Sequence, residues 1–185
     1  MLVTGVVLAA GAGRRMGTPK GLLRRPAGTS WAAAAAGLLT AAGCDPVLVT
    51  VGARAADVRA TLPPGVRAVE VPDWDRGPGA GVARALADPA VRAADAVLLQ
   101  LVDLPHVDLE GVRSVLGFAS RDALVRAVDG DRPGHPVLVG RDHVDAAAAA
   151  CAGGSGLREF LAGADVQRVP VRGSDADADG PQDVP

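Results

Sequence analysis

The sequence is poor in aromatic residues, with two tryptophans, two phenylalanines and no tyrosine among 185 residues. Because 49% of the residues are nevertheless apolar, alanine, valine and leucine must build the core. Such a core favours buried parallel strands covered by alanine-rich helices over an aromatic-rich β-sandwich. The length suits one domain with a single sizeable core.

Long apolar runs and paired cysteines are also missing. No segment reaches the roughly 20 apolar residues of a membrane-spanning helix. The apolar N-terminus has no basic segment before it and runs into Arg14 and Arg15, which is typical of a strand rather than of a signal peptide. Cys44 and Cys151 form no CxxC motif, so we expect small buried thiols in a reducing compartment. These features predict a cytoplasmic protein.

Charge of one sign does not dominate the chain. The formal net charge is −2 and the isoelectric point is near 5.9, which argues against a nucleic-acid or anionic-membrane partner. Lysine is nearly absent: Lys20 stands alone beside 18 arginines. One interpretation is chance, and the other is a site that needs a compact ammonium on a flexible stem.

Short apolar runs alternate with helical patterns along the chain. This alternation implies βαβ units and a mostly parallel sheet. Ligands of such sheets bind beyond the carboxyl ends of the strands, so function is expected in the loops after Ala9, Val71 and Leu101. The predicted strands cover 3–9, 46–51, 66–71, 96–101, 123–128 and 166–171, and the predicted helices cover 29–42, 55–62, 82–86, 108–118, 143–152 and 156–161.

The first of these loops, LAAGAGRRMGTPK over residues 8–20, matches neither common phosphate-binding spacing. A dinucleotide-binding G-x-G-x-x-G would need glycine where Met16 stands, and Gly52 occupies the position of the expected ribose-binding acid. A Walker P-loop needs lysine directly after glycine, whereas two residues separate Gly17 from Lys20. Nicotinamide dehydrogenases and P-loop NTPases are therefore disfavoured.

The same loop has the chemistry of a polyphosphate site. Small residues over 9–13 let the backbone approach a ligand and direct N–H groups at it. Arg14, Arg15 and Lys20 add three cations nearby. The alternative is a glycine-rich turn with solvated basic residues.

An aspartate follows the apolar run 96–101. A lone carboxylate at the end of a buried strand, beside phosphates, is a suitable ligand for Mg²⁺. Asp103 occupies this position, with Pro105 after it. The alternative is a turn or helix-cap aspartate, although Asp108 is better placed to cap the next helix.

The segment 173–185 is rich in aspartate and turn residues. Composition alone favours a solvated tail, and the alternative is that one aspartate folds back as a second metal ligand.

Taken together, LAAGAGRRMGTPKGLL, the VDLP element and GHPVLV resemble the nucleotidyltransferases of molybdenum-cofactor maturation, from Val6 to the tail. These cytidylyl- and guanylyltransferases belong to a larger group that activates sugar phosphates and other small phosphorylated acceptors. The resemblance implies a single Rossmann-like, three-layer α/β/α domain of the nucleotide-diphospho-sugar transferase type over 1–172. The acidic tail over 173–185 would follow it, folding back to the metal site.

The resemblance also assigns roles to individual residues. Asp103 would hold Mg²⁺, and Asp179 would be a second ligand. Arg15, Lys20 and Asp103 would be catalytic, and His135 would contact the acceptor. The nucleotide would be bound by the first loop, with an acidic residue near Asp73 at the base or sugar; this set comprises Leu8, Ala9, Ala10, Gly11, Gly13, Arg15, Lys20 and Asp73.

Ala10, Pro19 and GHPV lean toward the cytidylyl branch, whereas GPGAG at 77–81 is closer to the guanylyl branch. Departures from the family pattern concentrate in the later half: Val102 replaces a glycine, and the stretch 153–158 lacks its acid. We therefore expect Mg-dependent transfer of NMP from an NTP, CTP before GTP, to molybdopterin, with release of pyrophosphate. The alternatives are a sugar-phosphate acceptor or a non-catalytic NTP-binding regulator. The expected partners are these small molecules and a molybdoenzyme.

Overall fold

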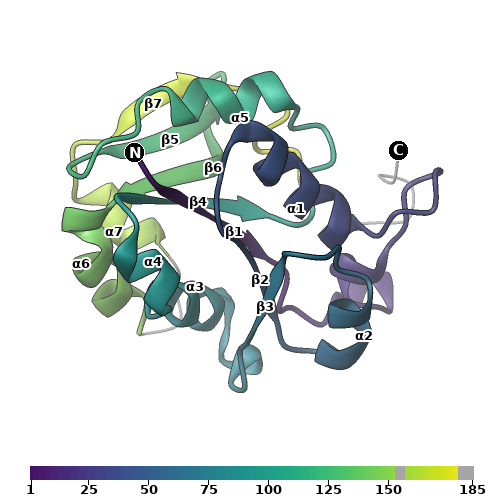
Figure 1. The fold of residues 1–185 in the computed structure, drawn as a ribbon. Coiled ribbons are helices and arrows are strands. Elements are labelled where there is room, and N and C mark those ends of the chain that lie inside the picture. The colour runs from purple at the N-terminus through teal and green to yellow at the C-terminus, as the bar shows by residue number, and fades with distance from the viewer. Residues whose placement is uncertain (153–156, 179–185) are drawn as a thin grey trace.

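The computed structural model describes residues 1–152 and 157–178. Its centre is a seven-stranded sheet in the order β3-β2-β1-β4-β6-β5-β7 (Figure 1). Strands β1 to β4 are parallel, β6 runs antiparallel to both β4 and β5, and β7 is parallel to β5. The strands are β1 (Val3–Leu8), β2 (Val47–Val51), β3 (Arg67–Glu70), β4 (Ala96–Leu101), β5 (Leu124–Asp129), β6 (Arg132–Gly140) and β7 (Gln167–Pro170).

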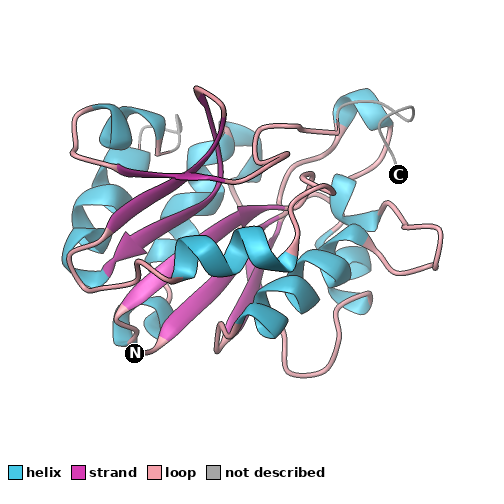
Figure 2. Cartoon of the chain, turned by 90° about the horizontal axis from the view of Figure 1, so that it is seen from above, coloured by secondary structure: helices cyan, strands magenta, loops and turns pink. Residues whose placement is uncertain are grey.

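Helices cover both faces of this sheet, as Figures 1 and 2 show. On one face α1, α2 and α5 pack over one buried cluster, and on the other α3, α4, α6 and α7 pack over a second. This arrangement confirms the predicted three-layer α/β/α fold. The helices are α1 (Trp31–Ala42), α2 (Ala55–Ala60), α3 (Pro78–Leu86), α4 (Pro89–Ala93), α5 (Leu109–Leu116), α6 (Arg141–Cys151) and α7 (Arg158–Ala162), with short 3-10 turns η1 (Arg14–Met16), η2 (Lys20–Leu22) and η3 (Trp74–Arg76).

Adjacent residues of the central strands point into opposite clusters. Val6 lies in the cluster under α3 and Val7 in the cluster under α1, and Val97 and Leu98 divide in the same way. Because both faces are buried, these strands are continuous apolar runs rather than alternating ones. This explains why composition and run length alone revealed them.

Local signals set the ends of α1, which matches the predicted helix 29–42 to within two residues. The Ser30 side chain accepts a hydrogen bond from the Ala33 amide at 3.1 Å, and Gly43 ends the helix with φ of 108°. Such an N-cap and left-handed C-terminal glycine satisfy backbone groups that the helix itself leaves unpaired.

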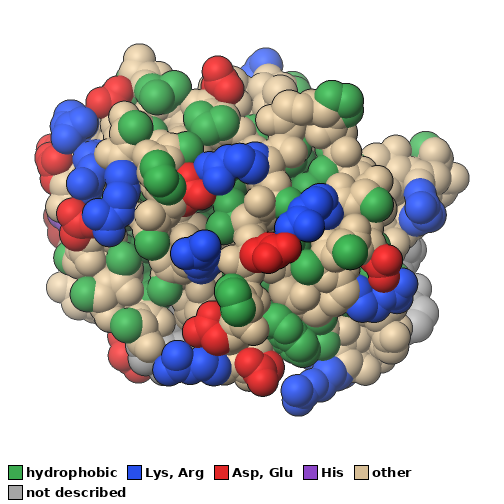
Figure 3. All heavy atoms as spheres, turned by 60° about the horizontal axis from the view of Figure 1, so that its bottom comes forward, with side chains coloured by type: hydrophobic (Ala, Val, Ile, Leu, Met, Phe, Trp, Pro, Cys, Tyr) green, Lys and Arg blue, Asp and Glu red, His purple; other side chains and the backbone are tan. Residues whose placement is uncertain are grey.

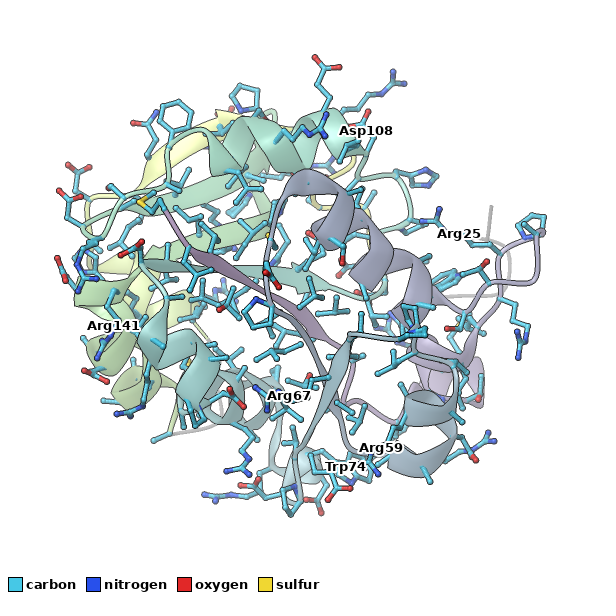
Figure 4. All side chains as sticks on the ribbon, viewed as in Figure 1. Arg25, Arg59, Arg67, Trp74, Asp108 and Arg141 are labelled. Atoms are coloured by element: carbon cyan, nitrogen blue, oxygen red, sulfur yellow. The ribbon has the colours of Figure 1, made fainter. Side chains whose placement is uncertain are left out.

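Two elements were not predicted, β6 and α4. Helix α4 begins with Asp88 as its cap and Pro89 at its first position, a signal present in the sequence. The Asp88 carboxylate also pairs with Arg67, which Figure 4 shows between β3 and α3. Burial acts to raise the pKa of Asp88, but hydrogen bonds from Arg67 and from the Ala90 amide outweigh it and lower the pKa overall.

Within the described residues, no helix is long and apolar enough to cross a membrane.

Candidate active site

The three loops expected to carry function line one cavity of about 850 Å³ at the carboxyl ends of β1, β2 and β4. The first loop contributes residues 8–14, the loop after β3 contributes Trp74 and Asp75, and the loop after β4 contributes residues 101–103. Cavities of this size suit ligands as large as a nucleotide with a small second substrate.

The first loop is held by a buried threonine on the neighbouring strand. Thr50 on β2 accepts a hydrogen bond from the Ala9 amide at 3.0 Å. The Ala9 amide is therefore already used, and amides later in the loop are the ones that can meet a ligand. Six predicted nucleotide-binding residues of this loop line the cavity: Leu8, Ala9, Ala10, Gly11, Gly13 and Lys20.

The loop turns sharply at Gly13, which has φ of 60°. A Cβ atom at this position would lie 1.9 Å from the Thr18 carbonyl oxygen, so only glycine fits. At Gly11, by contrast, nothing lies within 4 Å of an added Cβ atom, and the backbone there faces open space. Gly13 thus shapes the loop, and Gly11 leaves room beside it.

Lys20 and Asp103 meet in this cavity. Lys20 Nζ lies 2.6 Å from Asp103 Oδ2, and the two side chains are 15% and 16% exposed. Eighty-three positions separate the two residues in the sequence. The parallel pairing of β1 with β4 brings them together, because Leu8 and Leu101 are register partners at the ends of these strands.

Two other predicted residues lie beside the cavity rather than in its lining. Arg15 is exposed on η1, and its neighbour Arg14 lines the cavity. Asp73 pairs with Arg76 at 3.4 Å, while Trp74 and Asp75 line the cavity. Figure 4 shows Trp74 at the lower rim of the molecule, next to the end of β3.

His135 reaches the site because β6 runs against β4, so that the start of β6 lies beside the end of β4. Its Nδ1 atom lies 3.2 Å from the Leu99 carbonyl oxygen, which can only accept, so Nδ1 carries the hydrogen. The pKa of His135 is lowered to about 4, first by burial and also by Arg126, while the Leu99 hydrogen bond and Asp103 act in the opposite direction. The imidazole is therefore neutral at pH 7 and offers Nε2 as an acceptor.

The segment 173–178 packs against the site. The Ala178 amide donates to the Asp103 carbonyl oxygen at 2.9 Å, and Ser174 accepts from the His135 amide at 2.8 Å. A Cβ atom on Gly134 would lie 2.3 Å from the Ser174 carbonyl oxygen. Composition favoured a solvated tail, and this part of it is instead docked. Asp179 lies outside the described residues.

The donors present suit a magnesium ion carried by a nucleotide. The described residues contain no cluster of three or more His, Cys, Asp or Glu side chains that could hold a metal by themselves. Two carboxylates line the cavity, Asp75 at the rim and Asp103 beside Lys20, and the cavity is large enough for phosphates. Mg²⁺ commonly binds through one or two carboxylates, substrate phosphates and water, so this donor set fits.

Comparison with known proteins identifies the chain's relatives. Residues 5–170 match the family described as the MobA-like NTP transferase domain. The chain belongs to this family. Membership confirms the nucleotidyltransferase class that the motifs predict.

Two curated relatives of this MobA-like chain have different names. Nicotine blue oxidoreductase from Paenarthrobacter nicotinovorans is 35% identical over 86% of this chain and 81% of its own length. A probable molybdenum cofactor guanylyltransferase from Rhodopirellula baltica is 31% identical over 60% of this chain and 53% of its own length.

Solved structures agree with the fold of the MobA-like chain. Rv0371c from Mycobacterium tuberculosis has a TM-score of 0.81 and 29% identity over 99% of this chain and 95% of that chain. A manganese complex of Rv0371c has a TM-score of 0.74 and 28% identity, and covers 100% and 93% of the two chains. A 2-C-methyl-D-erythritol 4-phosphate cytidylyltransferase from Thermus thermophilus shares the fold, with a TM-score of 0.69 and 22% identity over 100% and 96% of the chains.

Other cavity residues were not singled out in the sequence: Thr50, Trp74, Asp75, Arg126 and Arg158. Arg126 had a visible signal, because it interrupts the apolar run LVRAV.

Proposed function

We propose that this protein transfers NMP from an Mg-bound NTP, CTP before GTP, to the phosphate of molybdopterin or its metal-loaded form, with release of pyrophosphate. The observation that supports this most strongly is the Lys20–Asp103 pair at 2.6 Å, in the cavity that the glycine-rich loop lines. Lys20 supplies a mobile cation for phosphate oxygens, and Asp103 supplies a carboxylate for the metal.

The chain's own groups perform binding and alignment. An acceptor phosphate is already anionic, so no general base is required, and the neutral His135 is left to contact the acceptor. When the triphosphate binds, the Lys20 ammonium leaves its ion pair with Asp103 and binds phosphate oxygens instead. It then neutralises the departing pyrophosphate, with Arg15 as a second cation. The loop amides after Ala9 hold the phosphates. Alignment and charge neutralisation supply the rate enhancement.

The proposed metal is Mg²⁺, held by Asp103. When bound, it supplies Lewis-acid polarisation and a template for the phosphate oxygens. Asp179 is proposed as its second ligand, supported by the hydrogen bond that ties Ala178, the preceding residue, to Asp103. The proposed domain therefore spans 1–172, and the tail 173–185 serves the site.

The choice of base and acceptor rests on the resemblance. Ala10 and Pro19 favour CTP. GTP is the alternative, because one curated relative is named as a probable guanylyltransferase. A sugar phosphate is the alternative acceptor, and an NTP-binding regulator without turnover is the alternative outcome. Asp73, beside Trp74 at the rim, keeps its proposed contact with the base or sugar.

The proposed partners are small molecules and a molybdoenzyme that receives the product, in the cytoplasm. Figure 3 shows acidic and basic side chains interspersed over one face, without a field of one sign. Such a face gives no support to a nucleic-acid or anionic-membrane partner.

A second candidate function, an oxidoreductase reaction, has one observation in its favour: the 35% identical relative is named nicotine blue oxidoreductase. The loop of residues 8–20 and Gly52 lack the dinucleotide-binding pattern, which counts against a nicotinamide donor bound in the Rossmann manner.

The test has two parts. Thermal shift measures binding of each of the four NTPs with Mg²⁺, and a pyrophosphate-release assay measures turnover with molybdopterin or a sugar phosphate as the acceptor. A ligand at a hundredfold its Kd stabilises by about 2.7 kcal/mol, which separates the bases clearly. Lys20→Ala and Asp103→Ala should each lower turnover by at least about tenfold while the protein remains folded. Arg25→Ala, outside the cavity lining, is the control.

Full activity in either variant would refute the assignment of Lys20 and Asp103. Oxidation of a reduced nicotinamide with nicotine blue, without pyrophosphate release from any acceptor, would favour the second candidate. Mg-dependent NTP binding without either reaction would indicate the regulator.

A further inference from the structure

Three arginines lie near one another at the edge of the sheet formed by β5 and β7, on β5, β7 and α7. Figure 1 shows these two strands side by side at one end of the sheet. Arg126 on β5 and Arg168 on β7 are register partners on parallel strands. Their neighbours Ala127 and Val169 belong to the cluster under α1 and α5, so both arginines face the opposite side, under α7. Arg158 is the first residue of α7.

This arrangement is unfavourable on its own. Like charges directly opposite one another destabilise a sheet. Burial lowers the pKa of Arg126 below its usual range, and Arg158 and Arg168 lower it further. A partly buried charge such as that of Arg126 is normally paired with an opposite charge, so the cluster points to an anionic ligand.

The guanidinium of Arg126 is only partly satisfied by the protein. Its Nε donates to the Gly134 carbonyl oxygen at 3.3 Å. In the part of the chain that the structure describes, no carboxylate forms an ion pair with Arg126 or Arg158. Arg168 is different, because it donates to the Asp131 carbonyl oxygen at 3.0 Å and pairs with the exposed Asp131 carboxylate at 3.8 Å, in the turn before β6.

The cluster opens into the active-site cavity. Arg126 and Arg158 line the same cavity as Lys20 and Asp103. Arg126 and Arg168 also line an adjoining cavity of about 350 Å³, where Asp165 is the one carboxylate in the lining. Positive charge therefore dominates the connection between the two cavities.

We propose that Arg126, with Arg158 and Arg168, forms the anion subsite that holds a phosphate ester of the acceptor. This inference rests on the proposed function and names the part of the site that takes the second substrate. The apolar body of such an acceptor would pack against Leu157 and Leu161, which line the cavity beside the arginines.

The position of the cluster separates it from the triphosphate site. The glycine-rich loop follows β1, whereas Arg126 lies on β5, three strands away in the order β1-β4-β6-β5. At about 4.8 Å between strands, this is a separation of about 14 Å at the level of the sheet. Asp103 follows β4, between the two groups, where the two substrates would meet.

The test uses inorganic phosphate as the probe, with the protein saturated by Mg·CTP and the ionic strength held constant with chloride. Thermal shift measures phosphate binding, and calorimetry measures the Kd of Mg·CTP. We compare wild type with Arg126→Gln, Arg168→Gln and the charge-matched control Arg59→Gln. Arg59 pairs with Glu70 on the surface and lies outside both cavities (Figure 4).

Phosphate should stabilise wild type and Arg59→Gln equally. Arg126→Gln should weaken phosphate binding at least about tenfold, the cost of a charge-assisted contact, and leave the Kd of Mg·CTP within about twofold. If Arg126→Gln does not fold, Arg168→Gln carries the test, with a smaller loss in the same direction.

Unchanged phosphate binding in the folded variants would overturn the subsite. Phosphate binding that is seen only when Mg·CTP is left out would also overturn it, since the anion would then occupy the nucleotide site. Phosphate binding that depends on Arg126, in a protein that releases no pyrophosphate with any NTP, would refute the proposed function and leave the anion site standing.

Discussion

Mild acid is expected to destabilise this protein through His135. Burial holds the pKa of this imidazole near 4, whereas an unfolded histidine titrates near 6.5. Between these two values the unfolded chain binds a proton that the folded protein excludes. The free energy of unfolding therefore falls as the pH falls below about 6.5, and the loss is complete below about 4.

The size of the effect follows from the two pKa values. With 6.5 unfolded and about 4 folded, His135 should lower the free energy of unfolding by about 2 kcal/mol between pH 7 and pH 5. Asp88, Asp95 and Asp122 have pKa values lowered from the ordinary range, so they remain ionised in both states over most of this window. Their contribution appears mainly at lower pH.

Urea unfolding at pH 7 and pH 5 measures the effect in wild type, His135→Gln and His143→Gln. His143 lies on α6, outside the cavity lining, and serves as the matched control. The His135→Gln variant should lose about 2 kcal/mol less than wild type over this interval, and His143→Gln should behave like wild type. Equal losses in wild type and His135→Gln would show that His135 is not buried in its neutral form.

Three further changes have defined outcomes. Gly13→Ala should destabilise the protein by at least about 1–2 kcal/mol in urea unfolding, because φ is positive and a carbonyl oxygen blocks the new Cβ atom, whereas Gly11→Ala should fold normally; equal stability of the two would contradict the geometry. Gly134→Ala should displace the segment 173–178 and expose it to limited proteolysis, and an unchanged cleavage pattern would show that this packing is dispensable. Arg67→Gln should cost about 1–3 kcal/mol in thermal unfolding, since it leaves the buried Asp88 carboxylate without its ion pair, and a cost below the roughly 1 kcal/mol of a surface pair would contradict this.

Local signals explain what the sequence predicted well. The strands of the parallel half are runs buried on both faces, so their composition alone reveals them. The ends of α1 depend on Ser30 and Gly43, whose roles follow from hydrogen bonds within a few residues. The loops after β1 and β4 could be assigned to one site because parallel strands end at the same edge of a sheet.

Strand β6 could not be read in the same way. Pro133 and Pro136 lie within it, and proline removes a donor from the ladder, so the segment does not look like an interior strand. The two-residue turn between Asp129 and Arg132 was an available hairpin signal. Without β6, the direction in which His135 enters the site could not be known.

Long-range packing accounts for the remaining differences. The arginine cluster depends on the pairing of β5 with β7, which joins residues about 40 positions apart. The docking of 173–178 depends on the approach of Ser174 to Gly134, which the aspartate-rich composition obscures. Neither has a periodic pattern, and both require the folded topology.

The reversal of strand direction between β4 and β6 has a consequence for how this fold can change its chemistry. One wall of the cleft comes from the consecutive β1–β4 units, and the other comes from the β5–β6 hairpin and α7. A longer or shorter hairpin at 130–131 would reshape the second wall and leave the register of the first four strands untouched. Changes to this surface turn could therefore alter which substrate binds against the second wall without disturbing the first. The turn at 130–131 is thus the place to engineer a new specificity.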